Sequence, residues 1–244
     1  MTANGIIGGS GLTRLEALSI ERREVLNTPY GDPSAPLLFG KLSGLDLVFL
    51  PRHGSAHSVP PHLVNYRANI WALHQVGVKE IIGMAAVGGI SPSMPPGTLC
   101  LADQVIDYTY GRKHTFFEED LVSVTHVDFT EPYCATLRAD LARAAATAGI
   151  EVLDKGTYGA TQGPRLESVM EIRRMARDGC DLVGMTGMPE AGLARELDLC
   201  YANFSLVVNW AAGLGEGPIT MREIERHLNI GMRQAIEVIS AMQR

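Results

Sequence analysis

The sequence lacks the features that mark nucleic-acid-binding and membrane proteins. Its 244 residues carry 21 Lys and Arg against 27 Asp and Glu, which gives a formal charge of −6. Binding to a nucleic-acid backbone needs a basic surface, so we expect neither nucleic acid nor an anionic membrane as a partner. The longest weakly polar stretch, Ile81–Ile90, is far too short to span a bilayer.

Cysteine is also scarce, and its spacing excludes the common metal and redox motifs. The four cysteines are Cys100, Cys134, Cys180 and Cys200, and no two form a Cys-x-x-Cys pair. Scattered cysteines with apolar neighbours are typical of buried thiols in a reducing cytosol. Residues 1–9 have neither the basic region nor the apolar region of a signal peptide. We therefore expect a cytoplasmic protein whose cysteines are free thiols.

Glycine, in contrast, is abundant, with 26 residues in the chain. This is about 11%, against a typical value of about 7%. Since 46% of the residues are hydrophobic, the excess does not indicate disorder. It indicates tight turns, or backbone that approaches a ligand closely.

Apolar runs typical of strands alternate along the chain with patterns typical of helices. The expected strands are Ile6–Ile7, Leu45–Leu50, Ile81–Val87, Leu99–Ile106, Asp181–Gly184 and Tyr201–Asn209. The expected helices are Val64–Val76, Pro132–Ala148, Glu167–Arg177, one that begins near Pro189 and one that begins at Thr220. This alternation predicts an α/β fold, a single domain over residues 1–244 with a central mixed, largely parallel and twisted sheet flanked by helices. Long loops are expected at residues 54–61 and 111–129, and long loops in compact domains are usually functional.

Glycine-rich or polar clusters lie at the ends of most of these strands. They are Gly8–Gly11, Arg52–Gly54, Ala85–Ile90, Thr161–Glu167, Gly184–Glu190 and Val208–Ala211. Each cluster taken alone also fits a plain turn, a solvated loop or a carboxylate at a helix start. In an open α/β sheet, however, ligands bind beyond the carboxyl ends of the strands. We therefore expect one site, with backbone N–H groups, an arginine and a helix N-terminus for an anion and a side-chain amide for a heteroaromatic ring.

A metal site is not expected. His53, His57 and His62 lie close together in the sequence, but no carboxylate or thiolate accompanies them at ligand spacing.

The order and spacing of these motifs resemble the trimeric purine nucleoside phosphorylase and methylthioadenosine phosphorylase family over nearly the whole chain. The resemblance is carried by Gly5–Leu12, Arg52–Gly54, Val64–Leu73, His126–Tyr133, Thr161–Arg165 and Gly184–Glu190. It implies a nucleoside phosphorylase-like fold, a pentosyltransferase activity and a homotrimer. It also implies that inorganic phosphate is a co-substrate and that no cofactor is needed.

The resemblance further implies roles for individual residues. The positions that match the family's phosphate site are Ser10, Arg52, His53, the backbone of Ala86, and Thr186. The positions that match its nucleoside site are Met185 at the ribose, Leu166, Glu167, Val183 and Asn209 at the purine, Met221 and Ile224 at the 5′ end, and His126 from the neighbouring subunit. Of these, Asn209, Glu167 and His53 are the expected catalytic residues. One position departs from the family, because Ala85 stands where a polar residue usually lies beside phosphate.

The same positions predict which base is bound. In the family, the adenosine-type members carry acids at the positions where this chain has Asn209 and Ala211. Glu167, as a carboxylate, accepts a hydrogen bond from the N1–H of a purine. Hypoxanthine and guanine have this N1–H, whereas neutral adenine does not. Mismatched buried polar groups cost about 1–3 kcal/mol each, so a 6-oxopurine is expected.

The apolar Met221 and Ile224 suit a 5′-methylthio group, while His227, one turn further along, leaves a 5′-hydroxyl possible. The expected reaction is phosphate-dependent cleavage of S-methyl-5′-thioinosine to hypoxanthine and S-methyl-5-thio-α-ribose 1-phosphate. The alternatives are a methylthioadenosine phosphorylase, an inosine or guanosine phosphorylase, a nucleosidase that uses water, and a nucleoside-binding protein without activity.

Overall fold

The computed structural model describes residues 4–9, 18–119 and 123–242. Within them, ten strands form one mixed sheet. The strands are β1 (Asn4–Gly8), β2 (Leu18–Glu24), β3 (Leu37–Leu42), β4 (Leu45–Pro51), β5 (Glu80–Gly89), β6 (Leu99–Leu101), β7 (Gln104–Asp107), β8 (Thr157–Ala160), β9 (Leu182–Gly184) and β10 (Cys200–Trp210). The helices are the short 3₁₀ helix η1 (Pro61–Leu63), α2 (Tyr66–Gln75), α3 (Ala135–Ala148), α4 (Val169–Asp178), α5 (Gly187–Glu196) and α6 (Met221–Ser240). The predicted α/β class, with a mixed sheet flanked by helices, is confirmed.

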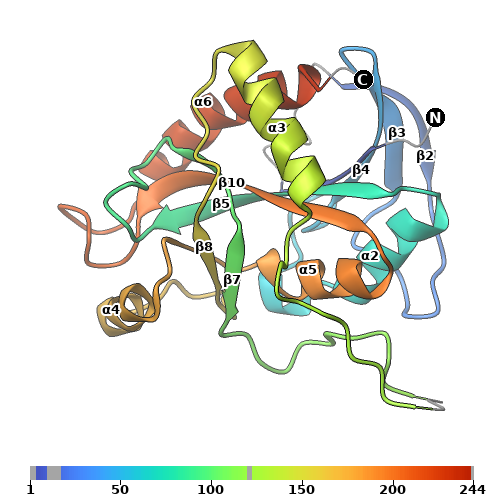
Figure 1. The fold of residues 1–244 in the computed structure, drawn as a ribbon, viewed down its shortest axis with the longest axis horizontal. Coiled ribbons are helices and arrows are strands. Elements are labelled where there is room, and N and C mark those ends of the chain that lie inside the picture. The colour runs from blue at the N-terminus through green and yellow to red at the C-terminus, as the bar shows by residue number, and fades with distance from the viewer. Residues whose placement is uncertain (1–3, 10–17, 120–122, 243–244) are drawn as a thin grey trace.

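Helices cover both faces of the central strands β5 and β10 (Figure 1). On one face α3 and α6 pack against the sheet, and Leu206 of β10 shares a core cluster with Leu141 and Ile239. On the opposite face α2 and α5 pack, and the next residue of β10, Val207, lies in a second cluster with Leu193. Successive side chains of a strand point to opposite faces, so a strand covered on both sides is apolar throughout. No helix in the described ranges is long and apolar enough to cross a membrane.

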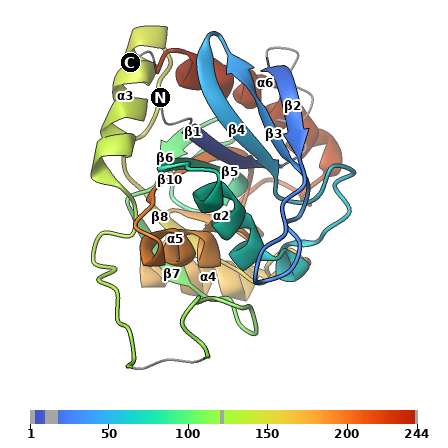
Figure 2. The same ribbon diagram turned by 90° about the vertical axis from the view of Figure 1, so that its right-hand side faces the viewer.

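The strand order along the sheet is β2-β3-β4-β1-β5-β9-β8-β7, and β10 pairs with β5 and β6. Figure 2 shows β2, β3 and β4 lying beside α6, against which they close the apolar layer. The pairings β1–β4, β1–β5, β5–β10, β7–β8 and β8–β9 are parallel, whereas β5–β9 is antiparallel.

A gap in the pairing of β5 creates room for a site. Along one edge of β5, β1 pairs with residues 81–83 and β9 pairs with residues 88–89. Among the described residues, Met84–Val87 have no strand partner on that edge. The carboxyl ends of β1 and β9 therefore face each other across an opening in the sheet.

The structure also differs from some of the predicted elements. The single strand expected at Leu99–Ile106 is wrong, because β6 and β7 are separate and pair with β10 and β8, respectively. The chain turns between them, where the Asp103 carboxylate accepts from the Gly156 N–H at 2.9 Å. The clusters around Ala86 and Asn209 lie inside β5 and β10 and not beyond their ends. The strands β2, β3 and β8 were not predicted.

The prediction of free thiols is wrong for two of the four cysteines. Cys134, at the start of α3, and Cys200, at the start of β10, form a disulfide with a Cα–Cα distance of 5.1 Å. The two residues are 66 positions apart in sequence. Their spacing therefore does not indicate that their Cα atoms lie within the distance range that allows a disulfide between the sulfur atoms. Cys100 and Cys180 are free and buried, as expected.

Candidate active site

A cavity of about 660 Å³ opens beside the unpaired segment of β5. Its walls include residues from all six clusters that the sequence singled out, among them Gly9 after β1. The predicted site residues that line it are Arg52, His53, Ala86, Leu166, Glu167, Val183, Met185, Thr186, Asn209, Met221 and Ile224. Ser10 lies outside the described residues. The fold thus brings together nearly all the residues that the sequence analysis selected.

Arg52 follows β4 and reaches under the gap in β5. Its Nη1 donates to the carbonyl of Met84 at 2.7 Å, which satisfies a backbone group that has no strand partner on that edge. Its Nε and Nη2 donate to the two carboxylate oxygens of Glu190 at 2.5 and 2.9 Å, and Nη2 also donates to the Ile7 carbonyl at 3.4 Å. A guanidinium has five N–H groups, so one N–H of Nη1 is left for a ligand in the cavity. The fork of Arg52 therefore holds Glu190, where the sequence suggested that it would hold phosphate.

His53 is neutral at pH 7. Burial and then the neighbouring Arg52 lower the pKa of His53 to about 4. Its Nδ1 lies 2.9 Å from the carbonyl oxygen of Val59, and because a carbonyl only accepts, Nδ1 carries the proton. Nε2 then presents a lone pair. His53 can therefore accept a hydrogen bond from a protonated phosphate oxygen.

Two further segments line the same part of the cavity. Ala86 is exposed although most of β5 is buried, which leaves its backbone accessible from the cavity. Thr186 precedes α5 and does not use its side chain to cap the helix. The N–H groups of Thr186 and Gly187 donate to the hydroxyl of Tyr158 at 3.3 Å. Thr186 thus lines the cavity at this end of α5, and the first N–H groups of the helix are engaged by Tyr158.

Glu167 lies on the opposite wall, just before α4. The sequence placed it inside a helix, but α4 is capped by Ser168 and begins at Val169. The Thr161 hydroxyl donates to Oε1 of Glu167 at 2.6 Å. This bond fixes one carboxylate oxygen and leaves Oε2 as an acceptor.

Asn209 sits near the end of β10, where its amide reaches the cavity. Nδ2 donates to the carbonyl of Trp210 at 2.7 Å. The amide is thus oriented by its own strand, and Oδ1 and the second N–H remain for a ligand. Val183 of β9 and Leu166 complete an apolar wall between Asn209 and Glu167.

The remaining wall is mostly apolar and comes from the last segment of the chain. Thr220 caps α6 by accepting from the Glu223 N–H. The apolar residues of this wall are Ile219, Met221, Ile224, Leu228 and Met232, and the charged Glu225 also belongs to it.

His227, the residue that kept a 5′-hydroxyl possible, is not part of the cavity lining. Its ring lies against Gly97.

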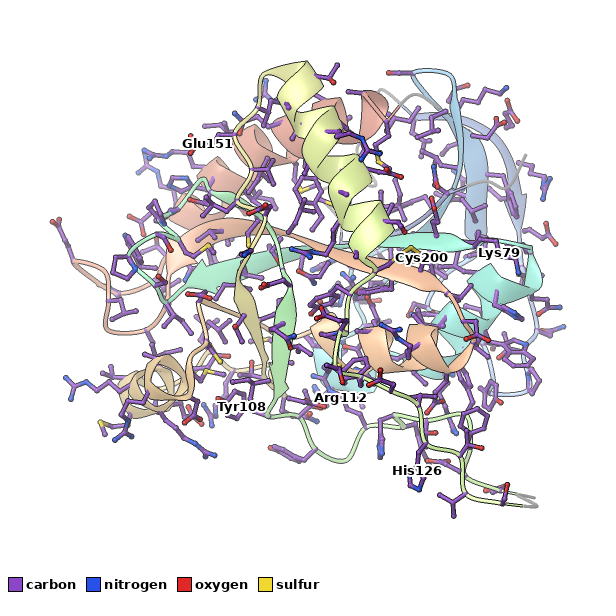
Figure 3. All side chains as sticks on the ribbon, viewed as in Figure 1. Lys79, Tyr108, Arg112, His126, Glu151 and Cys200 are labelled. Carbon is purple, nitrogen blue, oxygen red and sulfur yellow. A yellow bond between two sulfur atoms is a disulfide. The ribbon has the colours of Figure 1, made fainter. Side chains whose placement is uncertain are left out.

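His126 lies apart from the cavity of its own chain. Figure 3 shows it on the long loop that projects away from the sheet, and its side chain is exposed. It is the one described site residue that the fold does not bring to the others.

Sequence reasoning missed several residues at or beneath the cavity. His57 lines it, with its ring centroid 4.8 Å from that of His53. Glu190 and Tyr201 lie beneath it, and the hydroxyl of Tyr201 donates to Glu190 at 2.9 Å. The motif that ends in Glu190 was recognised, but nothing in the sequence showed that its acid would face Arg52. In residues 4–9, 18–119 and 123–242, no three His, Cys, Asp or Glu side chains gather in a way that could hold a metal ion.

The cavity beside the gap in the mixed sheet has one side suited to an anion, a polar wall suited to a base and a mostly apolar wall. This arrangement defines a nucleoside-binding enzyme of the phosphorylase type. The family model "Phosphorylase superfamily" matches residues 4–244. The chain belongs to this family.

Relatives and solved structures agree with that assignment. A protein of Pseudomonas syringae pv. tomato named "probable S-methyl-5′-thioinosine phosphorylase" is 56% identical over 232 residues, which cover 95% of this chain and 94% of the relative. The 6-oxopurine nucleoside phosphorylase of Pyrococcus furiosus is 43% identical and covers 97% of this chain, with 90% of the relative matched. The methylthioadenosine phosphorylase of Schistosoma mansoni in complex with adenine superimposes with a TM-score of 0.94 at 30% identity, covering 99% of this chain and 91% of that one.

Proposed function

We propose that this protein cleaves S-methyl-5′-thioinosine with inorganic phosphate, releasing hypoxanthine and S-methyl-5-thio-α-ribose 1-phosphate. The observation that carries the proposal is that Glu167 and Asn209 line one cavity whose remaining wall is mostly apolar. The relatives named for S-methyl-5′-thioinosine and for 6-oxopurine nucleosides support the same class of substrate.

The base follows from the hydrogen bonds that the two polar residues have free. Glu167 has an unoccupied carboxylate oxygen, which accepts from the N1–H of hypoxanthine. Asn209 has an unoccupied amide oxygen and one N–H, which accept from a protonated N7 or donate to O6. Adenine has no N1–H and carries an amino group in place of O6. A buried polar group left without its partner costs about 1–3 kcal/mol, so two mismatches select strongly against adenine.

The 5′ substituent follows from the apolar wall. Met221 and Ile224 have no group that could satisfy a 5′-hydroxyl, and His227 lies against Gly97 instead of lining the cavity. A methylthio group needs no hydrogen bond and packs well against methionine and branched aliphatic side chains.

In the proposed reaction, an oxygen of phosphate forms a bond to C1′ while the bond from C1′ to N9 breaks, and N9 leaves with the electron pair. The sugar becomes oxocarbenium-like, and the adjacent phosphate stabilises its positive charge. Negative charge grows on the purine, where the free N–H of Asn209 stabilises it by donating to O6, and the departed base then takes a proton from water. His53 accepts a hydrogen bond from a phosphate hydroxyl through Nε2, which directs another phosphate oxygen toward the sugar. Holding both reactants in one cavity supplies much of the acceleration.

The proposal includes a homotrimer. Val124 and Tyr110, each 73% exposed, lie on the same loop as His126 and give it apolar surface suited to burial against another subunit. In such a trimer His126 completes the 5′ end of a neighbouring cavity. Light scattering on the purified protein tests the trimer, and a monomer that retains full activity would refute this role of His126.

The test of the proposed reaction is one series of assays on the purified protein. Methylthioinosine, methylthioadenosine, inosine and guanosine are each supplied with and without phosphate, and the released base and sugar phosphate are quantified. We expect methylthioinosine with phosphate to give the highest kcat/KM and no base to be released when phosphate is absent.

Each alternative produces a different pattern in this series. Higher turnover of methylthioadenosine would refute the assignment of the base, and higher turnover of inosine or guanosine would refute the assignment of the 5′ group. Release of base without phosphate would identify a nucleosidase. Binding without any turnover would identify a nucleoside-binding protein.

A further inference from the structure

We propose that Arg112 is a positioning residue that couples the purine-binding and ribose-binding parts of the cavity. Arg112 lies on the loop that follows β7, next to α5, in the view of Figure 3. No role was assigned to it from the sequence, and it does not line the cavity. This inference rests on the proposed function.

The side chain of Arg112 is buried, with 7% of its surface exposed. In the part of the chain that the structure describes, its hydrogen-bond partners include no carboxylate. They are instead the carbonyl oxygens of Thr161, Gln162, Met185 and Met188, the side-chain oxygen of Gln162 and the hydroxyl of Tyr66. A buried charge is costly unless its surroundings are polar and well ordered, so these oxygens must converge on the guanidinium.

The first pair of bonds acts on the base-reading carboxylate. Nη2 of Arg112 donates to the carbonyls of Thr161 and Gln162 at 3.0 and 2.9 Å. The hydroxyl of the same Thr161 donates to Oε1 of Glu167 at 2.6 Å. Arg112 therefore holds the backbone from which Glu167 is aimed at the purine.

The second pair of bonds acts on the sugar and phosphate side. Nη1 of Arg112 donates to the carbonyl of Met185 at 2.9 Å and to that of Met188 at 2.6 Å. Met185 and Thr186 line the cavity between these two held carbonyls. One planar group thus bridges two strand-end segments, which are also joined by the pairing of β8 with β9 and by the bond from the Thr161 N–H to the Gly184 carbonyl at 2.8 Å.

All the donors of Arg112 are used in these contacts, so none is available to a substrate. Its role is to position other residues. Lysine cannot replace it, because an ammonium presents three donors from one point and cannot bridge two segments with a rigid fork. A shift of about 1 Å in a reacting group can reduce the rate about 100-fold.

The experiment compares Arg112→Lys with Arg67→Lys. Arg67 is a matched control, because it anchors the same loop from α2, and among the described residues its side-chain hydrogen bonds reach only Thr115 at 3.4 Å and Glu118 at 2.9 Å. For Arg112→Lys we expect kcat/KM for methylthioinosine to fall about 100-fold and the preference for methylthioinosine over methylthioadenosine to fall about 10-fold. For Arg67→Lys we expect the preference to stay unchanged. Thermal unfolding of both variants reports any loss of stability.

The change in base preference separates positioning from a structural role. The inference would be overturned if Arg112→Lys were less stable but kept the wild-type preference for methylthioinosine over methylthioadenosine. It would also be overturned if this preference changed equally in Arg112→Lys and Arg67→Lys. If Arg112→Lys does not fold, Thr161→Val removes only the hydroxyl between the held segment and Glu167, and an unaltered preference there would also overturn it. If the wild-type protein does not cleave methylthioinosine, the proposed function fails by itself, and the preference is then measured on the nucleosides that it does cleave.

Discussion

Arg52 and Glu190 form a two-point ion pair in the core, with Nε–Oε1 and Nη2–Oε2 distances of 2.5 and 2.9 Å. The side chain of Arg52 is 2% exposed and that of Glu190 is fully buried. Burial by itself lowers the pKa of Arg52, but the facing carboxylate outweighs it and raises that pKa above its ordinary value. The pair lets the protein keep a positive guanidinium at the floor of the cavity.

Glu190→Gln should destabilise the protein strongly. The change leaves the Arg52 charge buried without its partner, and breaking one side of a buried ion pair costs about 3–5 kcal/mol. Chemical unfolding measures the loss, and the KM for phosphate should rise because Arg52 is no longer held. Glu171→Gln is the control, because its ion pair with Arg165 is solvent-exposed and worth at most about 1 kcal/mol. Equal losses in the two variants would contradict the role of the buried pair.

His53 should make the stability of the unliganded protein depend on pH. The pKa of His53 is lowered to about 4, whereas an unfolded histidine titrates near 6.5. Between these values the unfolded chain binds a proton that the folded chain does not, so stability is complete above pH 6.5 and falls as the pH drops toward 4. His53→Asn keeps a donor for Val59 but does not titrate. The Tm of the wild type should therefore decrease relative to that of the variant over this range. A Tm difference that is the same at pH 4 and pH 7 would show that His53 is not held neutral.

Ile224→Asn should improve the use of nucleosides with a 5′-hydroxyl. Ile224 lines the mostly apolar wall of the cavity, and an amide at this position adds a neutral hydrogen-bond partner for a 5′-hydroxyl. We expect the ratio of kcat/KM for inosine to that for methylthioinosine to rise about 10-fold. Ile230→Asn changes an exposed residue of the same helix and should leave the ratio as in the wild type. An unchanged ratio in Ile224→Asn would place the 5′ group elsewhere.

The fold was predictable where strands are buried on both faces. β4, β5 and β10 appear in the sequence as continuous apolar runs, because helices cover both of their sides. β2 was missed because Leu18–Glu24 contains four charged residues and is largely exposed. β8 was missed because it has only four residues.

The site was predictable as a set of strand ends, but not as a hydrogen-bond network. Arg52 and Asn209 could be predicted as site residues because each is a polar residue at the end of an apolar run. Nothing local shows that Arg52 is paired with an acid 138 residues away, or that Arg112 is surrounded by carbonyls from two distant segments. Such pairings depend on the tertiary arrangement of the strands, which local sequence patterns do not specify.

The disulfide between Cys134 and Cys200 should contribute measurably to stability. It closes a loop with a sequence separation of 66 residues, and a loop of this kind typically stabilises a protein by about 2–4 kcal/mol. Adding a reductant should lower the Tm of the wild type to that of the double variant Cys134→Ser/Cys200→Ser, which should not respond to the reductant. A wild-type Tm that is the same with and without reductant would show that the two thiols do not form a bond in solution.

Asn209→Asp should shift the base preference toward adenine. The amide of Asn209 is oriented by its bond to the Trp210 carbonyl, and an aspartate in the same place could share a proton with N7 and accept from a 6-amino group. One corrected mismatch is worth about 1–3 kcal/mol, so the preference for methylthioadenosine over methylthioinosine should rise about 10- to 100-fold. The shift should be partial, because Ala211 supplies no second acid and Glu167 still favours a base that has an N1–H.

Competition between the two nucleosides in one reaction measures this shift directly, since it gives the ratio of their kcat/KM values. Asn229→Asp introduces the same charge at an exposed position of α6 and is the control for a general effect of charge. A preference in Asn209→Asp that matches this control would mean that Asn209 does not contact the base, and the assignment of a 6-oxopurine would then depend on Glu167 alone.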